Sequence, residues 1–229
     1  MATEVRFEGV KLGYGSEVIS NATFEAIGPC LFAMLGPNGS GKTTILRAMI
    51  KIIEPICGRI LINGTDIADI RIAELPDIIS YAPADFDDQM WMSALNVIMS
   101  AKISGRWIKE KEALCAMEEM GISDLAYARF GELSTGQKRL VLLARAFASK
   151  AKILLLDEPT SGLDMRNKDI VKRQIMKISK KCTVITATHD MELARSSGKI
   201  IPLVGGKAIS AGDPRKMLTK VMIKRVYGL

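Results

Sequence analysis

The chain has 229 residues, of which 48% are hydrophobic, and a formal net charge of +7 at pH 7. This length allows one large core or two lobes but not two full-sized independent domains, and no apolar stretch is long enough to span a bilayer. The first residues lack the basic and apolar regions of a secretory signal, and the basic residues near the C-terminus lack the interleaved aromatic rings of a base-stacking surface. We therefore expect a non-secreted globular protein with a solvated basic surface.

The four cysteines are scattered along the chain, without a Cys-x-x-Cys pair, at Cys30, Cys57, Cys115 and Cys182. This pattern favours reduced thiols in the core of a cytosolic protein over a metal site.

The N-terminal part of the chain predicts strands and one short amphipathic helix. Alternating or continuous apolar patterns predict strands at residues 5–10, 22–26, 30–35 and 58–64. Apolar residues at helical spacing predict a helix over residues 43–51.

A phosphate-binding loop is predicted between the strand at 30–35 and that helix. Its sequence is Gly36-Pro37-Asn38-Gly39-Ser40-Gly41-Lys42-Thr43-Thr44. Glycines let successive backbone N–H groups turn inward as an anion nest, and the helix N-terminus adds partial positive charge. In such loops the lysine, here Lys42, reaches the β- and γ-phosphates, and the following hydroxyl, here Thr43, binds Mg²⁺. The loop therefore predicts binding of a nucleoside triphosphate.

Residues 84–130 differ in character from the rest of the chain. Methionine and alanine become frequent, β-branched runs disappear, and residues 108–120 carry apolar side chains at helical spacing. We interpret residues 84–130 as a helical subdomain inserted into an α/β catalytic lobe made of residues 1–83 and 131–229.

The segment after this insertion predicts a well-capped helix. Ser134 and Gln137 have the spacing of a capping box, and Leu140, Leu143 and Phe147 follow on one helical face. Taken alone, this segment would indicate only a capped surface helix.

Buried parallel strands are predicted at residues 153–156 and 183–186, because both runs are continuously apolar or β-branched. Asp157 and Glu158 end the first of these strands, where ligands of open α/β sheets bind. Asp157 is a candidate Mg²⁺ ligand and Glu158 a candidate proton acceptor, although a salt-bridge anchor is the structural alternative. His189, the single histidine, follows the second strand.

Residues 200–204 and 208–211 flank Gly205-Gly206 and predict a hairpin.

In this order, the motifs resemble the nucleotide-binding domain of ATP-binding cassette (ABC) proteins over essentially the whole chain. Residues 133–137 resemble the family's signature sequence, with Thr135 where glycine is more usual. Residues 157–164 resemble the second carboxylate motif continuing into the D-loop, and residues 188–190 resemble the segment of the switch histidine.

The resemblance implies a fold, an activity and further site residues. The fold is a P-loop α/β core with a mostly parallel sheet, an antiparallel β region and the inserted helical subdomain. The activity is ATP hydrolysis, with ATP and Mg²⁺ as cofactors. Tyr14 matches the aromatic residue that stacks on adenine, and the position of His189 implies a contact with the γ-phosphate.

The resemblance also implies partners. In the family the signature residues, here Ser134, Thr135, Gly136 and Gln137, complete the site of a second subunit, which gives a head-to-tail homodimer with two ATP molecules between the subunits. It further implies a separately encoded transmembrane permease, an external substrate-binding protein, and a cytoplasmic position on the inner face of the cell membrane. We expect no nucleic-acid partner.

A finer resemblance concerns the transported substrate. Residues 132–148, 212–219 and 226–229 resemble the ATPases of iron-siderophore, haem and vitamin B12 importers. The resulting hypothesis is an importer ATPase for a metal chelate or similar cofactor. The alternatives are a soluble ABC ATPase, such as an iron–sulfur assembly factor, and the ATPase of a multi-subunit exporter.

One position departs from the family pattern. The family has a glutamine after a strand ending in Tyr-x-Pro, which reaches Mg²⁺ and the attacking water, whereas Ala84 follows Pro83 here. Asp85 or, after a loop shift, Gln89 are candidate substitutes. We favour a water molecule in that position.

Overall fold

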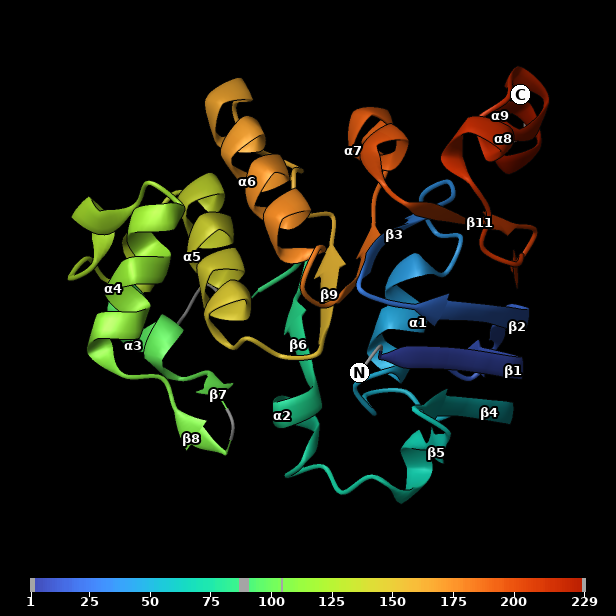
Figure 1. The fold of residues 1–229 in the computed structure, drawn as a ribbon, viewed down its shortest axis with the longest axis horizontal. Coiled ribbons are helices and arrows are strands. Elements are labelled where there is room, and N and C mark those ends of the chain that lie inside the picture. The colour runs from blue at the N-terminus through green and yellow to red at the C-terminus, as the bar shows by residue number, and fades with distance from the viewer. Residues whose placement is uncertain (1–2, 87–90, 104, 228–229) are drawn as a thin grey trace.

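The computed structural model describes residues 3–86, 91–103 and 105–227, and a ten-stranded sheet runs through this part of the chain (Figure 1). The strands lie in the order β5-β4-β1-β2-β12-β11-β3-β10-β9-β6. Their bounds are β1 Glu4–Gly13, β2 Glu17–Ile27, β3 Cys30–Leu35, β4 Cys57–Ile62, β5 Thr65–Asp66, β6 Ile79–Ala82, β9 Ile153–Asp157, β10 Thr183–Ala187, β11 Lys199–Val204 and β12 Lys207–Ala208.

The parallel half of the sheet consists of β11, β3, β10, β9 and β6. Every residue of β9 and β10 is buried, as their continuous apolar sequences predict. Met34 of β3 pairs with Ala187 of β10, and Ala187 pairs with Asp157 of β9. The three strands therefore end level with one another at one edge of the sheet.

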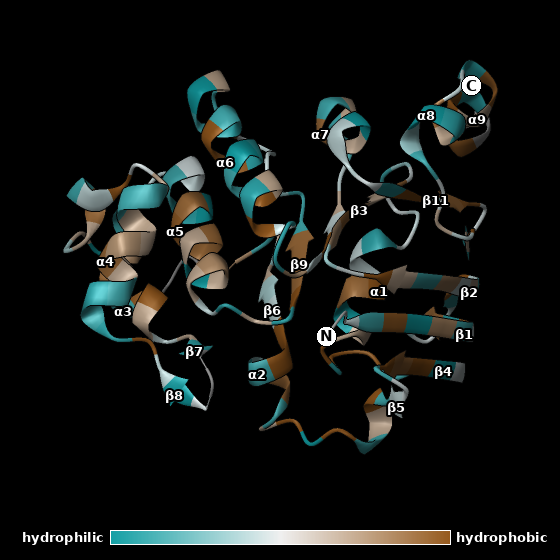
Figure 2. Cartoon of the chain, in the orientation of Figure 1, coloured by the Kyte–Doolittle hydropathy of each residue, from teal (hydrophilic) through white to brown (hydrophobic). Residues whose placement is uncertain are grey.

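The antiparallel half is built on β1, which pairs with both β2 and β4. Buried and exposed residues alternate along β2, and Figure 2 shows the corresponding bands of hydrophobic and hydrophilic colour. Phe7 and Phe24 stack across β1 and β2 with ring centroids 4.5 Å apart. β11 and β12 form an antiparallel pair at the predicted hairpin, and this pair joins the two halves into one sheet.

The helices extend from α1 near the N-terminus to α9 at the C-terminus. Their bounds are α1 Lys42–Ala48, α2 Leu75–Ile78, α3 Ala94–Met99, α4 Glu110–Glu119, α5 Thr135–Ala148, α6 Met165–Ile178, α7 Met191–Ser196, α8 Pro214–Met217 and α9 Lys220–Tyr227. Three short 3₁₀ helices, η1 Ile67–Asp69, η2 Ser123–Leu125 and η3 Phe130–Glu132, and a small hairpin of β7 Lys102–Ile103 and β8 Arg106–Trp107 complete the described elements. The helices predicted at residues 43–51 and 108–120 correspond to α1 and α4, which are slightly shorter.

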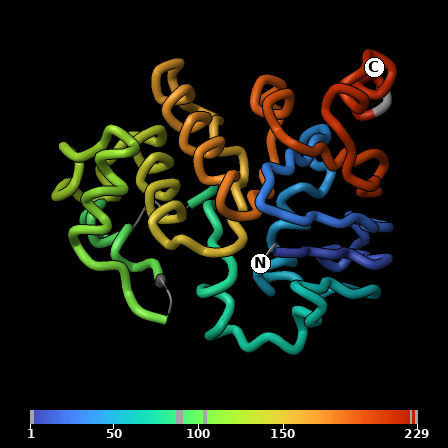
Figure 3. The backbone as a smooth tube through the Cα atoms, viewed as in Figure 1, coloured from blue at the N-terminus to red at the C-terminus, as the bar shows by residue number. Residues whose placement is uncertain are grey.

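Helices α3, α4 and α5 pack together at one end of the molecule, away from the antiparallel strands (Figure 1). The fully buried Met117 of α4 and Phe130 of η3 belong to one hydrophobic cluster, which also includes Leu154 and Leu156 of β9. Helix α5 thus packs on the helices of the inserted segment, and the boundaries at residues 84 and 130 stay a prediction. The chain trace shows β3, from the N-terminal part, beside β11, from the C-terminal part (Figure 3).

The expectation that the cysteines are core thiols is wrong for Cys57 and Cys115, which are exposed; Cys30 and Cys182 are partly buried. Helix α4 buries Ala113 and Met117, four residues apart, so Cys115 between them lies on the opposite, solvent-facing side. Cys57 begins β4, where the first three residues are all exposed.

Candidate functional site

The predicted phosphate loop connects the end of β3 to the start of α1. Gly39 and Gly41 have φ of 77° and 95°, values that glycine adopts without the steric strain of a side chain. A Cβ atom on Gly41 would collide with Ile19, and one on Gly36 would collide with Ser40. The loop therefore needs glycine both for its backbone turn and for its close packing.

Lys42 lies inside this loop and is only 7% exposed. Its ammonium donates hydrogen bonds to the carbonyl oxygens of Gly36, at 2.8 Å, and of Pro37, at 3.1 Å. Burial lowers the pKa of Lys42, whereas the charges of Glu158 and Asp157 act in the opposite direction. The loop thus holds a positive charge at its centre, and phosphate oxygens are suited to replace the carbonyl oxygens as acceptors.

Asp157, at the end of β9, is 2% exposed. The Tyr81 hydroxyl donates to its Oδ2 at 3.3 Å, and its Oδ1 is buried without a hydrogen-bond partner among the described residues. Burial raises the pKa of Asp157, and hydrogen bonding from Thr43 and Tyr81 partly opposes the rise. A buried carboxylate oxygen without a donor, next to a hydroxyl of the phosphate loop, fits the oxygen ligands that Mg²⁺ takes.

Glu158 follows directly and adopts φ of 48°, in the left-handed region. Its N–H donates to the carbonyl of Ala187 at 2.8 Å, so β10 holds this turn in place. The side chain is 17% exposed, and its Oε2 lies 2.7 Å from Nδ1 of His189 and accepts a hydrogen bond from the His189 N–H at 3.3 Å. The carboxylate and the imidazole, predicted separately from the sequence, therefore form a contacting pair.

Register explains how these groups meet. Met34, Ala187 and Asp157 are level in the sheet, so Gly36, His189 and Glu158 all lie one or two residues beyond the same edge. The structure thus brings together the phosphate loop, both carboxylates and the histidine.

Arg139 is a residue of this site that the sequence analysis missed. It is 8% exposed, and its guanidinium donates to the carbonyl oxygens of Glu158, at 2.5 Å, and of Ala84, at 2.7 Å. Arg139 therefore connects helix α5, the turn at Glu158 and the loop after β6. Spacing within α5 gives no signal for this role, because the two carbonyl partners lie just after β9 and just after β6, far from Arg139 in the sequence.

The loop after β6 differs from the family pattern at Ala84. Ala84 is partly buried and its carbonyl is held by Arg139, whereas Asp85 is exposed. Gln89, the other candidate substitute ligand, lies outside the described residues.

Tyr14 lies beside α1 at the edge of the antiparallel strands. Tyr14 is 54% exposed, and its hydroxyl accepts a hydrogen bond from Arg47 of α1 at 3.2 Å. An exposed ring anchored at its hydroxyl offers a free aromatic face.

The predicted capping box at the start of α5 is confirmed. The Gln137 N–H donates to Ser134 Oγ at 3.3 Å, and the Ser134 N–H donates to Gln137 Oε1 at 2.9 Å. Ser134 and Thr135 are exposed, and the backbone of Gly136 lies near Gly162 and Leu163. The helix N-terminus therefore presents these residues outward, and none of their hydrogen bonds within the described chain reaches the phosphate loop.

Comparisons with known proteins agree with this geometry. Residues 21–161 match the family model described as ABC transporter. An uncharacterised ABC transporter ATP-binding protein of Methanocaldococcus jannaschii is 33% identical over 97% of this chain and 90% of its own length. The ferric enterobactin transport ATP-binding protein FepC of Escherichia coli is 30% identical over 98% of this chain and 87% of its own length. The phosphonates import ATP-binding protein PhnC of Bradyrhizobium diazoefficiens is 30% identical over 97% and 89%.

Solved structures show the same fold. A bacterial Atm1-family ABC exporter with ATP bound matches with a TM-score of 0.84 and 26% identity over 94% of this chain, which spans 40% of the exporter chain. A transporter described as of metal-chelate type, in an inward-facing conformation, matches with a TM-score of 0.80 and 27% identity over 99% of this chain and 90% of that one.

The two hydrogen bonds of Arg139 lead to a stability prediction. Arg139→Lys keeps the charge but cannot reach both carbonyls, so it should leave a buried acceptor unpaired and lower the free energy of unfolding by about 1–3 kcal/mol. Urea denaturation measures the change. Arg173→Lys, at an exposed position of α6, is the control and should change stability by less than about 0.5 kcal/mol. Equal stability of the two variants would contradict the bridging role.

Proposed function

The chain belongs to the ABC transporter family, and we propose that it hydrolyses ATP as a dimer to drive uptake of a metal chelate through a separate membrane subunit. The observation that carries the proposal is the meeting of the phosphate loop, Asp157, Glu158 and His189 at one edge of the sheet. Relatives of this length and similarity are ABC transporter ATP-binding proteins, and the chain is accordingly an ATPase.

The phosphates of ATP bind in the loop of residues 36–44. Its N–H groups and the start of α1 surround the β- and γ-phosphates, and Lys42 moves its hydrogen bonds from the loop carbonyls to phosphate oxygens. The exposed ring of Tyr14 stacks on adenine. These groups bind and orient the nucleotide without contributing to the proton transfer.

Hydrolysis depends on the pair of Glu158 and His189. Glu158 takes a proton from the attacking water, and its carboxylate is already oriented by two contacts with His189. The exposed imidazole of His189 contacts the γ-phosphate in this proposal. Thr43 and Asp157 would hold Mg²⁺, which neutralises charge on the phosphates, and a water molecule takes the position of the family's glutamine beside Ala84.

A second copy of the chain completes each site. The exposed N-terminus of α5 carries Ser134, Thr135 and Gly136, with Gln137 in the capping box, and is an anion-binding surface that its own phosphate loop does not use. Two chains related by a two-fold axis place each α5 against the partner's ATP. Binding of ATP closes this dimer, and hydrolysis opens it.

A membrane partner fits the exposed apolar side chains beside the loop after β6. Trp91 is 86% exposed, Tyr127 is 77% exposed and Met92 is 42% exposed. A backbone hydrogen bond from the N–H of Phe130 to the carbonyl of Met92, at 2.9 Å, places these two segments side by side. In the described ranges, none of the helices is both long and apolar enough to cross a bilayer. We propose that the chain works on the inner face of the membrane, as the transport relatives suggest, against a separately encoded permease that receives its substrate from an external binding protein.

The substrate class rests on two relatives. The enterobactin protein and the metal-chelate-type transporter each cover nearly all of this chain. A phosphonate-import relative is equally similar, and an exporter shares the fold, so uptake has to be measured directly.

Substitution of the proposed base tests the chemistry. Glu158→Gln should bind ATP normally but hydrolyse it on the order of 10²–10⁴ times more slowly, because the amide cannot accept a proton. Phosphate release measures the rate, and size-exclusion chromatography with ATP should show an accumulated dimer. Glu118→Gln, at an exposed position of α4, is the control. Wild-type turnover together with a monomer in ATP would contradict both the base and the dimer.

Mixing variants tests the composite site. Ser134→Arg and Lys42→Ala should each abolish hydrolysis, yet their heterodimer has one intact site, with Lys42 from one chain and Ser134 from the other. A mixture should therefore regain part of the wild-type rate. The control mixes Lys42→Ala with the double variant Lys42→Ala/Ser134→Arg, in which no site is intact. No recovery in a mixture that demonstrably forms heterodimers would rule out the head-to-tail arrangement.

Uptake by the source cells tests the transport role. Cells that carry Lys42→Ala should lose uptake of a radiolabelled ferric chelate and keep uptake of a phosphonate. Loss of phosphonate uptake alone would change the substrate class, and unchanged uptake of both would favour a soluble ATPase or an exporter.

A further inference from the structure

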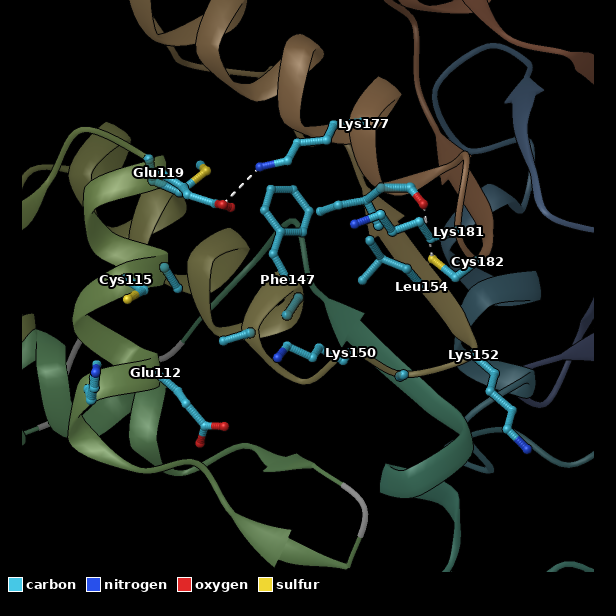
Figure 4. A pocket seen from close by; sticks show the side chains of 17 residues that line it. Glu112, Cys115, Glu119, Phe147, Lys150, Lys152, Leu154, Lys177, Lys181 and Cys182 are labelled. Carbon is cyan, nitrogen blue, oxygen red and sulfur yellow. Dashed lines mark hydrogen bonds and ion pairs between the residues drawn. The ribbon is translucent and has the colours of Figure 1, made fainter.

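A pocket of about 620 Å³ lies between α4, the C-terminal ends of α5 and α6, and the start of β9; we call it the α4–α6 pocket (Figure 4). Its volume is in the range of small-molecule sites. Its apolar lining comes from Ala116, Met120, Ala146, Phe147, Leu154 and Ile178. Figure 4 shows Phe147 between a wall that carries Cys115 and Glu119 and a wall that carries Lys177 and Cys182.

The pocket is separate from the phosphate site. β9 contributes Leu154 to the pocket and Asp157, at its other end, to the phosphate site. Helix α6 likewise begins after the D-loop and reaches the pocket only at Lys177, near its C-terminal end. None of the residues that line the pocket belongs to the candidate ATP site.

The pocket carries excess positive charge. Its lining includes five lysines but only two acidic residues. Glu112 is held by Arg106 at 2.7 Å, and Glu119 pairs with Lys177 at 2.8 Å. Within the described chain the remaining lysines, Lys111, Lys150, Lys152 and Lys181, have no ion pair.

Lys150 shows how the charge is arranged around the pocket. It follows the end of α5 with φ of 51°, in the left-handed region that normally favours glycine. The pKa of Glu112, on α4, is lowered to about 2, mainly by its hydrogen bond with Arg106. The charge of Lys150 adds a smaller contribution to this lowering, so it acts across the pocket on α4. Lys150 therefore adds positive charge next to the wall of the pocket that α4 forms.

We propose that the α4–α6 pocket binds a small soluble anion with an apolar body, such as an alkyl phosphate or an alkyl carboxylate. The apolar lining around Phe147 takes the body, and the lysines without ion pairs take the anionic group. The proposal is independent of the proposed transport function, since it uses other residues.

Two exposed cysteines provide a local measurement. Cys115 lines the pocket, whereas Cys57 lies on β4 and serves as an internal control. The full chain is alkylated with N-ethylmaleimide, with or without octyl phosphate below its micelle concentration, and mass spectrometry follows each cysteine. Octyl phosphate should slow modification of Cys115 several-fold and leave Cys57 unchanged. Equal rates at Cys115 with and without octyl phosphate, or equal slowing at both cysteines, would overturn the proposal.

Related probes test the two parts of the ligand. Inorganic phosphate lacks the apolar body and octyl glucoside lacks the charge, so neither should protect Cys115. Protection by either one alone would overturn the proposed ligand class. Vesicles that contain phosphatidylglycerol should also fail to protect, and protection by them would point to a lipid headgroup instead of a soluble anion.

Paired variants test the lysines. Lys150→Gln/Lys181→Gln should lose the protection by octyl phosphate. Lys180→Gln/Lys224→Gln removes the same charge from exposed positions outside the pocket and should keep it. Full protection in the first pair, or equal loss in both pairs, would overturn the assignment.

Discussion

The site depends on the parallel pairing of β3, β10 and β9. Because Met34, Ala187 and Asp157 are level in the sheet, the segments that follow them emerge at one edge. β9 contributes Leu154 and Leu156 to one hydrophobic cluster and Ile153 and Leu155 to another, on the opposite face of the sheet. A shift of one residue in either pairing would exchange the side chains between the two faces, so packing on both faces fixes the register. The continuous apolar sequence of β9 and the β-branched sequence of β10 thus position Asp157, Glu158 and His189 beside the phosphate loop that follows β3, although Lys42 of that loop lies more than a hundred residues before Asp157 in the sequence.

Hydrogen bonds then hold those groups in an otherwise costly arrangement. Glu158 has a left-handed backbone, a conformation that costs a residue with a side chain roughly 1–2 kcal/mol. Its N–H is paired with Ala187, its carbonyl with Arg139 and its carboxylate with His189, so every polar group of this residue has a partner. The buried Asp157, by contrast, keeps one oxygen without a donor. This contrast is what distinguishes the proposed proton acceptor, Glu158, from the proposed cation ligand, Asp157.

The local features of the site could be predicted from the sequence, whereas its cross-connections could not. Glycine spacing identifies the phosphate loop, and the capping box at Ser134 involves residues only three apart. Arg139 escaped prediction because its partners, the carbonyls of Ala84 and Glu158, carry no side-chain signal. The predicted burial of Cys115 is wrong for a related reason. Thiols are usually buried, but which face of α4 carries Cys115 depends on how that helix packs against the rest of the chain.

The most direct test of this account locates the residues around the γ-phosphate. With ADP and Mg²⁺, vanadate occupies the position of that phosphate, and ultraviolet light then cleaves the backbone next to it. The account predicts cleavage within residues 36–44 and, in the closed dimer, a second cleavage within residues 134–137. Cleavage confined to other segments, in protein that has trapped the nucleotide, would contradict the proposed site.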